Sequence, residues 1–198
     1  MIEGIGRRMA DPLVIDKTRE LYDGNGMAID ANDLMLVVVH RISLAKRGVT
    51  DGDLNGHSLV AGFVDSSMGT GGRTPYHLLV MADGTCEQML PLSVRGSHSK
   101  GYNRKSIAVA VVGEHDQCTP AQFNKLAKVC AVLLTMNGGL RLAGHTSLHG
   151  ASADAGKICP APVVDIEELD RVVKVRLQAV PTTQAGSDWL LSENGFRV

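Results

Sequence analysis

The sequence predicts an α/β fold, a single domain with a mixed central β-sheet of about five or six strands flanked by helices. Two short apolar runs rich in β-branched residues predict strands buried on both faces, LMLVVVH at 34–40 and SIAVAVVG at 106–113. Between them, YHLLVM at 76–81 and CEQML at 86–90 flank an Asp-Gly turn, which predicts a hairpin. Strands that alternate with helices complete the pattern of this fold class.

Local signals also predict where the helices begin. The sequence TPAQ at 119–122 predicts the start of a helix over 120–136, because threonine caps, proline suits the first turn and glutamine completes a capping box. Apolar residues recur at helical spacing in this segment, and a Gly-Gly pair follows it. RLAGH at 141–145 predicts a short strand, and DIEELDRVVKVRLQ at 165–178 predicts a second helix.

Composition narrows the classes of function. A chain of 198 residues suits one domain with short extensions. Hydrophobic residues make up 44% and charged residues 21%, as in a globular domain with a real core. The net charge of -1 gives no broad basic field, so we expect no nucleic-acid partner.

The compartment is predicted from what the chain lacks. The N-terminal segment has no apolar run like that of a signal peptide, and no stretch reaches the ~18 apolar residues of a membrane span. The four cysteines are not spaced like a secreted disulfide framework. We therefore expect synthesis in the cytoplasm and no membrane insertion, with any action outside the cell following release or delivery.

Three residues form a candidate metal site. His40 and His145 each end a predicted strand, and Cys159 follows His145 by fourteen positions in a loop. Each alone is more often structural, and no contiguous zinc motif is present. Together they supply two nitrogens and one sulfur with a fourth position open, which is the composition of a catalytic zinc site. His149 lies in the same loop and competes with Cys159 for the third ligand.

These segments, in this order, resemble the type 2 N-acetylmuramoyl-L-alanine amidases, the zinc fold shared by phage endolysins and peptidoglycan-recognition proteins. The resemblance rests on a strand ending in His40, then PYHLLVMADGT, GSHSKGYNRKSIAVAVVG, TPAQ, GH at 144–145 and KICP. It covers residues 34–162, and the block 96–113 most resembles the phage branch. It implies hydrolysis of the amide bond between the lactyl group of N-acetylmuramic acid and L-alanine in peptidoglycan.

The resemblance also implies residue roles. His40, His145 and Cys159 match the three Zn²⁺ ligands, and Tyr76 matches a tyrosine beside the reactive water. Lys157, two positions before the cysteine, matches a lysine that faces the metal. Without the resemblance, Tyr76 equally reads as a strand residue that packs on its hairpin partner, and Lys157 reads as a solvated loop lysine.

Other polar residues near these motifs have weaker assignments. His98 and Asn103 match a segment near the cleft, so we expect them to bind substrate. His77 is expected to be structural, and its side chain is expected to point away from that of Tyr76. His57, His115 and His149 are expected at the surface. Arg41 departs from the family, in which a small residue often follows the first histidine.

The resemblance predicts an N-terminal extension over 1–33, a catalytic domain over 34–178 and a tail over 179–198. The predicted function is that of a phage or prophage endolysin. The lack of a signal-peptide pattern fits this function, and it fits a cytoplasmic recycling amidase or an injected effector equally well. A non-catalytic recognition module typically loses the cysteine or the tyrosine, and this chain keeps both. A structural zinc protein would need a fourth ligand, and none is obvious. The oligomeric state stays open.

Overall fold

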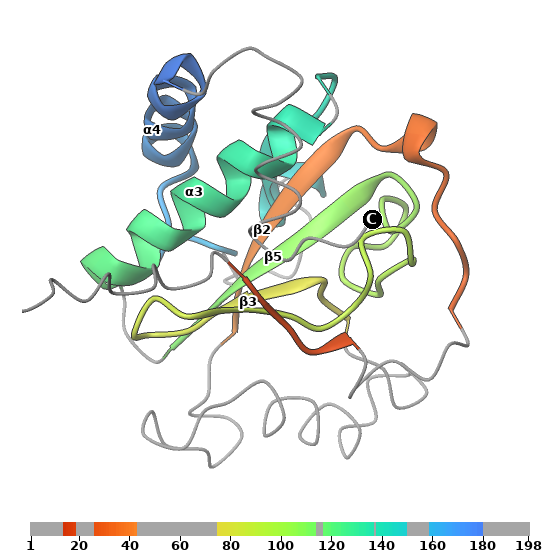
Figure 1. The fold of residues 1–198 in the computed structure, drawn as a ribbon, viewed down its shortest axis with the longest axis horizontal. Helices are drawn as coiled ribbons and strands as arrows, with labels where there is room; N and C mark the ends of the chain where they lie inside the picture. The colour runs from red at the N-terminus through yellow and green to blue at the C-terminus, as the bar shows by residue number, and fades with distance from the viewer. Residues whose placement is uncertain are drawn as a thin grey trace, which may run out of the picture.

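The described part of the chain folds as a six-stranded mixed sheet with two long helices on one face (Figure 1). The computed structural model describes residues 14–18, 26–42, 75–113, 117–136, 138–149 and 159–179. Within these ranges, no helix is both long and apolar enough to cross a membrane. The predicted fold class is confirmed.

The sheet has the strand order β1-β4-β3-β5-β2-β6. Its members are β1 (Ile15–Asp16), β2 (Leu36–Ile42), β3 (Leu78–Val80), β4 (Cys86–Gln88), β5 (Ser106–Val112) and β6 (Arg141–Gly144). Every neighbouring pair is parallel except the β3–β4 hairpin. The helices are α3 (Pro120–Met136), α4 (Ile166–Ala179) and the short 3₁₀ turns η1 (Ala31–Asp33) and η4 (Thr146–Leu148).

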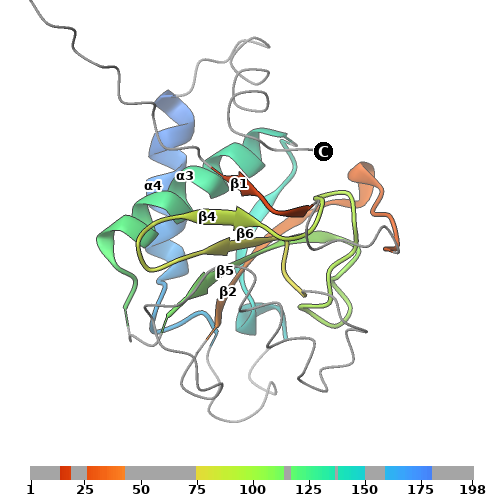
Figure 2. The same cartoon turned by 60° about the horizontal axis from the view of Figure 1, so that its bottom comes forward.

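The predicted strands, hairpin and helices are confirmed with small shifts at their ends. The hairpin strands are shorter than predicted: β3 begins at Leu78, so Tyr76 and His77 lie before it. The predicted N-terminal extension contributes to the domain, since Ile15 and Asp16 form the edge strand β1 beside β4 (Figure 2). The short helix suggested by HSLVAGFV at 57–64 lies outside the described residues.

The start of α3 ties the helix to the sheet. Thr119 Oγ1 accepts a hydrogen bond from the Gln122 backbone N–H at 3.1 Å, and Gln122 Oε1 accepts one from the Thr119 N–H at 3.1 Å. These two bonds are the predicted capping box. Gln122 Nε2 also donates to the carbonyl of Val112 at 2.7 Å. One buried glutamine therefore fixes both the helix end and its position over β5.

The two faces of the sheet differ in what they bury. The helix face packs the apolar sides of α3 and α4 against Val37, Val39 and Val109, all fully buried. The opposite face, called the site face here, carries Ile42, Leu79, Met81, Met89, Ala110 and Val112, with Tyr76 packed against them. His40 alternates with Val39 along β2, so its side chain lies on the site face.

His77 is a structural residue of this sheet, as expected. Its side chain is fully buried, Nδ1 accepts from the Ala108 N–H at 2.9 Å, and Nε2 donates to the Val94 carbonyl at 2.8 Å. The bonds require a neutral ring with its proton on Nε2. Burial lowers the pKa of His77 from 6.5 to about 4, while the bond to Val94 opposes part of that shift.

His77 should make the fold sensitive to acid. In the unfolded chain the His77 ring binds a proton below about pH 6.5, but in the folded chain it does so only below about pH 4. The free energy of unfolding therefore falls as the pH is lowered through that window. The loss attributable to His77 is about 3 kcal/mol. Urea unfolding of wild type and His77→Leu at pH 7 and pH 4.5 measures it.

The variant leaves two buried backbone groups unpaired, so it should be less stable than wild type at pH 7 by about 1–3 kcal/mol for each group. Because leucine does not titrate, this gap should narrow at pH 4.5. Parallel losses of stability in the two proteins would show that His77 does not carry the acid sensitivity.

Candidate metal centre

Two parallel strands bring two histidines to one edge of the sheet. His40 lies near the carboxyl end of β2, and His145 directly follows β6. The strands are in register with Val39 opposite Gly144, and the His145 N–H donates to the Val39 carbonyl at 3.2 Å. The two imidazole rings lie with centroids 4.5 Å apart.

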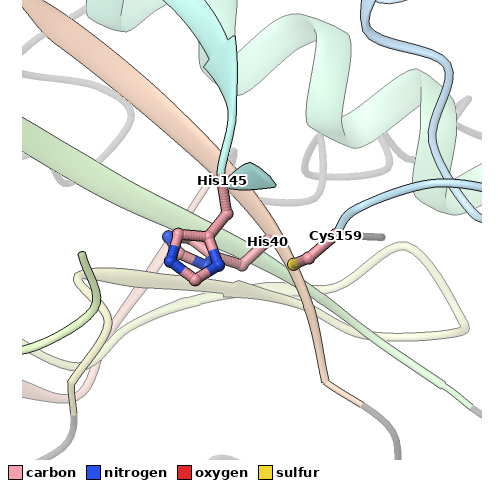
Figure 3. A group of neighbouring side chains, drawn as sticks. All are labelled: His40, His145 and Cys159. Atoms are coloured by element: carbon pink, nitrogen blue, oxygen red, sulfur yellow. The ribbon is translucent and has the colours of Figure 1, made fainter. Parts of the chain in front are cut away.

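Cys159 completes the group from the segment that precedes α4. Figure 3 shows the side chains of His40, His145 and Cys159 directed toward one another. One ligand atom from each lies within 4.8 Å of the others. Among the residues that the structure describes, no other histidine, cysteine or carboxylate joins them, so His149 does not take the place of Cys159.

Backbone and side-chain hydrogen bonds hold Cys159 in place. Its N–H donates to Thr146 Oγ1 at 2.7 Å, and its carbonyl accepts from the Thr146 N–H at 2.9 Å. The Arg41 N–H donates to Cys159 Sγ at 3.3 Å. Arg41 thus contributes to the site through its backbone, which any residue except proline can supply.

His98 contacts one of these histidines directly. His40 Nε2 and His98 Nδ1 are 3.0 Å apart, and His98 Nε2 lies 3.3 Å from Ser106 Oγ. His98 is 8% exposed, so its ring is engaged mainly with protein atoms. Burial, followed by the neighbouring His77 and His145, lowers the pKa of His98 to about 3.

The loop that carries His98 is braced by Asn103. Asn103 Oδ1 accepts from the backbone N–H groups of His98 at 2.9 Å and Ser99 at 2.7 Å. Ser99 Oγ lies 2.8 Å from His149 Nε2, which joins this loop to η4. Substrate binding by His98 and Asn103 stays a prediction.

His149 departs from its expected surface position. It is half-buried, with its ring edge-on to His145 at a centroid distance of 5.1 Å and to Tyr102 at 5.8 Å. The short turn η4 causes this, because it folds the chain after His145 back toward the 98–106 loop. The other two histidines expected at the surface, His57 and His115, lie outside the described residues.

The electrostatics favour uncharged histidines at the site. Burial lowers the pKa of His40 well below 6.5, and the neighbouring His98, His145 and His149 lower it further. Burial, and then His149, lower the pKa of His145. Neutral imidazole is the form that binds a metal. Burial raises the pKa of Cys159. The hydrogen bond from the Arg41 N–H and the positive charge of Arg41 oppose part of that rise.

The donor set fits zinc. Two imidazole nitrogens and one thiolate are zinc ligands, and tetrahedral zinc would separate them by roughly 3.3–3.6 Å. The observed limit of 4.8 Å is close enough for small side-chain rotations to reach that geometry. Three protein ligands leave one position open, as catalytic zinc sites do and structural sites do not.

A cavity borders the segment that carries Cys159. A cavity of about 730 Å³ lies between η4 and the start of α4, lined by Thr146, Cys159, Pro160 and Ile166 among others. The Tyr76 ring lies 5.1 Å from the His40 ring. Tyr76 therefore reaches the site as expected, whereas Lys157 lies outside the described residues.

The sequence is similar to a family of amidases and to phage endolysins. The sequence profile described as N-acetylmuramoyl-L-alanine amidase matches residues 30–162. The endolysin of Escherichia phage T7 is 36% identical over 93 residues, which cover 43% of this chain and 58% of the endolysin. The endolysin of Klebsiella phage KP32 is 33% identical over the same length. The chain thus matches less than two thirds of the length of these relatives.

Solved structures share the fold at low sequence identity. The Ph2119 endolysin of a Thermus scotoductus bacteriophage has a TM-score of 0.57 and 17% identity, over 81% of this chain and 98% of the endolysin. A Drosophila PGRP-LB mutant in complex with tracheal cytotoxin has a TM-score of 0.59 and 14% identity, over 79% and 92% of the two chains. With the profile spanning most of the sheet and all three candidate ligands, the chain belongs to the N-acetylmuramoyl-L-alanine amidase family.

Proposed function

We propose that this protein is a zinc-dependent N-acetylmuramoyl-L-alanine amidase that degrades bacterial cell walls for a phage. The observation that carries the proposal is the convergence of His40, His145 and Cys159 within 4.8 Å at the carboxyl ends of two parallel strands. The phage endolysins among its relatives support a lytic role. The structural relative that holds tracheal cytotoxin, a form of peptidoglycan, supports the substrate class.

In this proposal His40, His145 and Cys159 hold the zinc. The metal supplies Lewis-acid polarisation of the scissile carbonyl and makes water reactive near neutral pH. With these three protein ligands, a fourth position on the metal would stay available for water or substrate.

The remaining residues handle charge and protons. Attack of water on the carbonyl carbon places negative charge on the carbonyl oxygen, and the Lys157 ammonium stabilises it. The hydroxyl of Tyr76, whose ring packs near that of His40, moves a proton between the attacking water and the leaving nitrogen. The carbon–nitrogen bond then breaks, giving a lactyl carboxylate and the free amino group of L-alanine. His98 and Asn103 are proposed to lie along the stem peptide.

A recognition module that binds peptidoglycan without cutting it is the competing function. The two readings separate when purified protein is incubated with muropeptides and the products are identified by mass spectrometry. The amidase releases an intact stem peptide that begins with L-alanine and leaves the glycan unbroken. Muropeptides that are bound but recovered unchanged would support the recognition module and overturn the proposal.

The metal is tested separately from the reaction. Freshly purified protein should contain one zinc ion per chain by elemental analysis, and a chelator should remove it together with the activity. Cys159→Ser should lose zinc, because a hydroxyl is a far poorer ligand than a thiolate. Cys118→Ser is the matched control: that thiol is half-buried outside the site, so zinc should stay. A zinc-free protein that remains active in chelator would exclude the metal.

Tyr76→Phe should keep zinc but hydrolyse peptidoglycan about 10²–10³-fold more slowly, since it loses only a hydroxyl from the reacting centre. The tilted packing of ring 76 against His40 should survive the change. Steady-state hydrolysis, with zinc content and unfolding midpoint measured on the same preparation, checks this. Turnover at the wild-type rate would assign Tyr76 to packing alone.

Lys157→Ala should lower turnover by about 10²–10³-fold while zinc content and stability stay unchanged, because an ammonium donor to the oxyanion is lost. Lys157→Arg should recover only part, since a planar guanidinium does not replace a compact point charge. Lys128→Ala, at an exposed position on α3, controls for loss of a surface charge. Normal turnover in Lys157→Ala would remove this residue from the mechanism.

A further inference from the structure

A buried line of hydrogen bonds starts at His40 Nε2. His40 Nε2 lies 3.0 Å from His98 Nδ1, His98 Nε2 lies 3.3 Å from Ser106 Oγ, and Ser106 Oγ lies 2.8 Å from the Tyr102 carbonyl oxygen. His40, His98 and Ser106 are all buried. Fifty-eight positions separate the two histidines in the chain.

The far end of this line sets the direction of every bond in it. A carbonyl oxygen only accepts, so Ser106 must donate its single proton to Tyr102. Ser106 Oγ therefore accepts from His98, which places the His98 proton on Nε2. In a neutral ring the other nitrogen is then an acceptor, so His98 Nδ1 accepts from His40. The His40 proton is consequently on Nε2, and its lone pair is on Nδ1.

We propose that His98 is a positioning residue, which holds His40 in the Nε2–H tautomer and turns its Nδ1 toward the metal. The proposal rests on the metal site of the proposed function and adds a role for His98 beyond substrate binding. A histidine ligand usually donates its second N–H to a fixed acceptor, which sets ring orientation and strengthens the ligand. Here the acceptor is another imidazole.

The loop around His98 is built to keep that acceptor in place. Asn103 fixes the backbone at His98 and Ser99, and the Ser97 N–H donates to the Pro75 carbonyl at 3.1 Å. Gly96 permits this approach, because a Cβ there would lie 2.5 Å from the Pro75 oxygen. The His98 ring meets the His40 ring edge-on at 90°. His98 thus has little freedom to point its Nδ1 elsewhere.

His77 provides an internal comparison. It is as deeply buried as His40 and lies 6.0 Å from the His98 ring, but its two nitrogens bond only to backbone groups. A purely structural histidine in this part of the sheet would therefore behave like His77. Substitution of His77 should weaken the fold and leave the affinity for zinc within a few-fold of wild type.

The tautomer can be read directly from the ¹⁵N spectrum of histidine-labelled wild-type protein at neutral pH. In the zinc-free protein we expect the proton of both His40 and His98 on Nε2, and zinc should shift the His40 Nδ1 resonance. The His98→Gln spectrum assigns the two rings. A His40 proton on Nδ1, or zinc bound through Nε2, would overturn the proposal.

Zinc affinity supplies the second measurement. His98→Phe fills the space without an acceptor and should weaken zinc binding by about 10–100-fold in a competition with a chromogenic chelator. His98→Gln offers a carbonyl oxygen to His40 and should recover most of that loss. His77→Leu is the matched control for a buried histidine. Wild-type affinity in His98→Phe, or equal losses in His98→Phe and His77→Leu, would overturn the proposal.

These outcomes are separable from a failure of the proposed function. If wild type binds no zinc, the metal-dependent amidase fails, and the tautomer of His40 in the metal-free protein still decides the role of His98. If His98→Phe does not fold, the wild-type spectra decide it. If wild type binds zinc through His40 Nδ1 but cuts no muropeptide, His98 remains a positioning residue in a site of another function.

Discussion

The parallel pairing of β2 with β6 is the constraint on which the site depends. It sets Val39 opposite Gly144, so His40, the next residue of β2, and His145, the residue after β6, lie beside each other. Because side chains alternate along a strand, a slip of one residue would send His40 into the helix face. The geometry of the site therefore depends on this strand register. The fully buried valines of β2, which point to both faces of the sheet, fix that register.

The position of Cys159 also depends on β2 and on the turn after β6. The segment before α4 returns to β6 and η4, where Thr146 pairs with its backbone and the Arg41 N–H reaches its sulfur. Cys86 differs: it is buried in the apolar helix face, and burial is the largest of the effects that raise its pKa to about 12. A thiol there is a small hydrophobe, whereas Cys159 lies among donors that favour a ligand.

Placing several histidines inside a sheet carries a cost that hydrogen bonds offset. His77 satisfies both ring nitrogens with the backbone, and His98 satisfies its pair with His40 and Ser106. Unpaired, each buried nitrogen would cost a few kcal/mol. The hydrogen-bonded loop from Gly96 to Ser106 therefore serves two purposes, since it closes the end of the sheet and completes the polar partners of the site.

The sequence by itself determined the elements and the identity of the candidate ligands. Apolar runs, the Asp-Gly turn and the Thr119 capping box act over a few residues, so the strands, the hairpin and α3 were predictable from local pattern. Strand ends marked His40 and His145, and the order of motifs marked Cys159. These features are predictable because they depend on interactions between residues that are close in the sequence.

Only the tertiary structure decided how these pieces meet. It placed His98 against His40 across fifty-eight positions, His149 against His145 through η4, and the first described residues beside β4 as an edge strand. No periodicity links His98 to His40, because their contact follows from the pairing of β2 with β5 and the turn of a loop before β5. Contacts of that range are set by packing of the whole sheet, which no local pattern records.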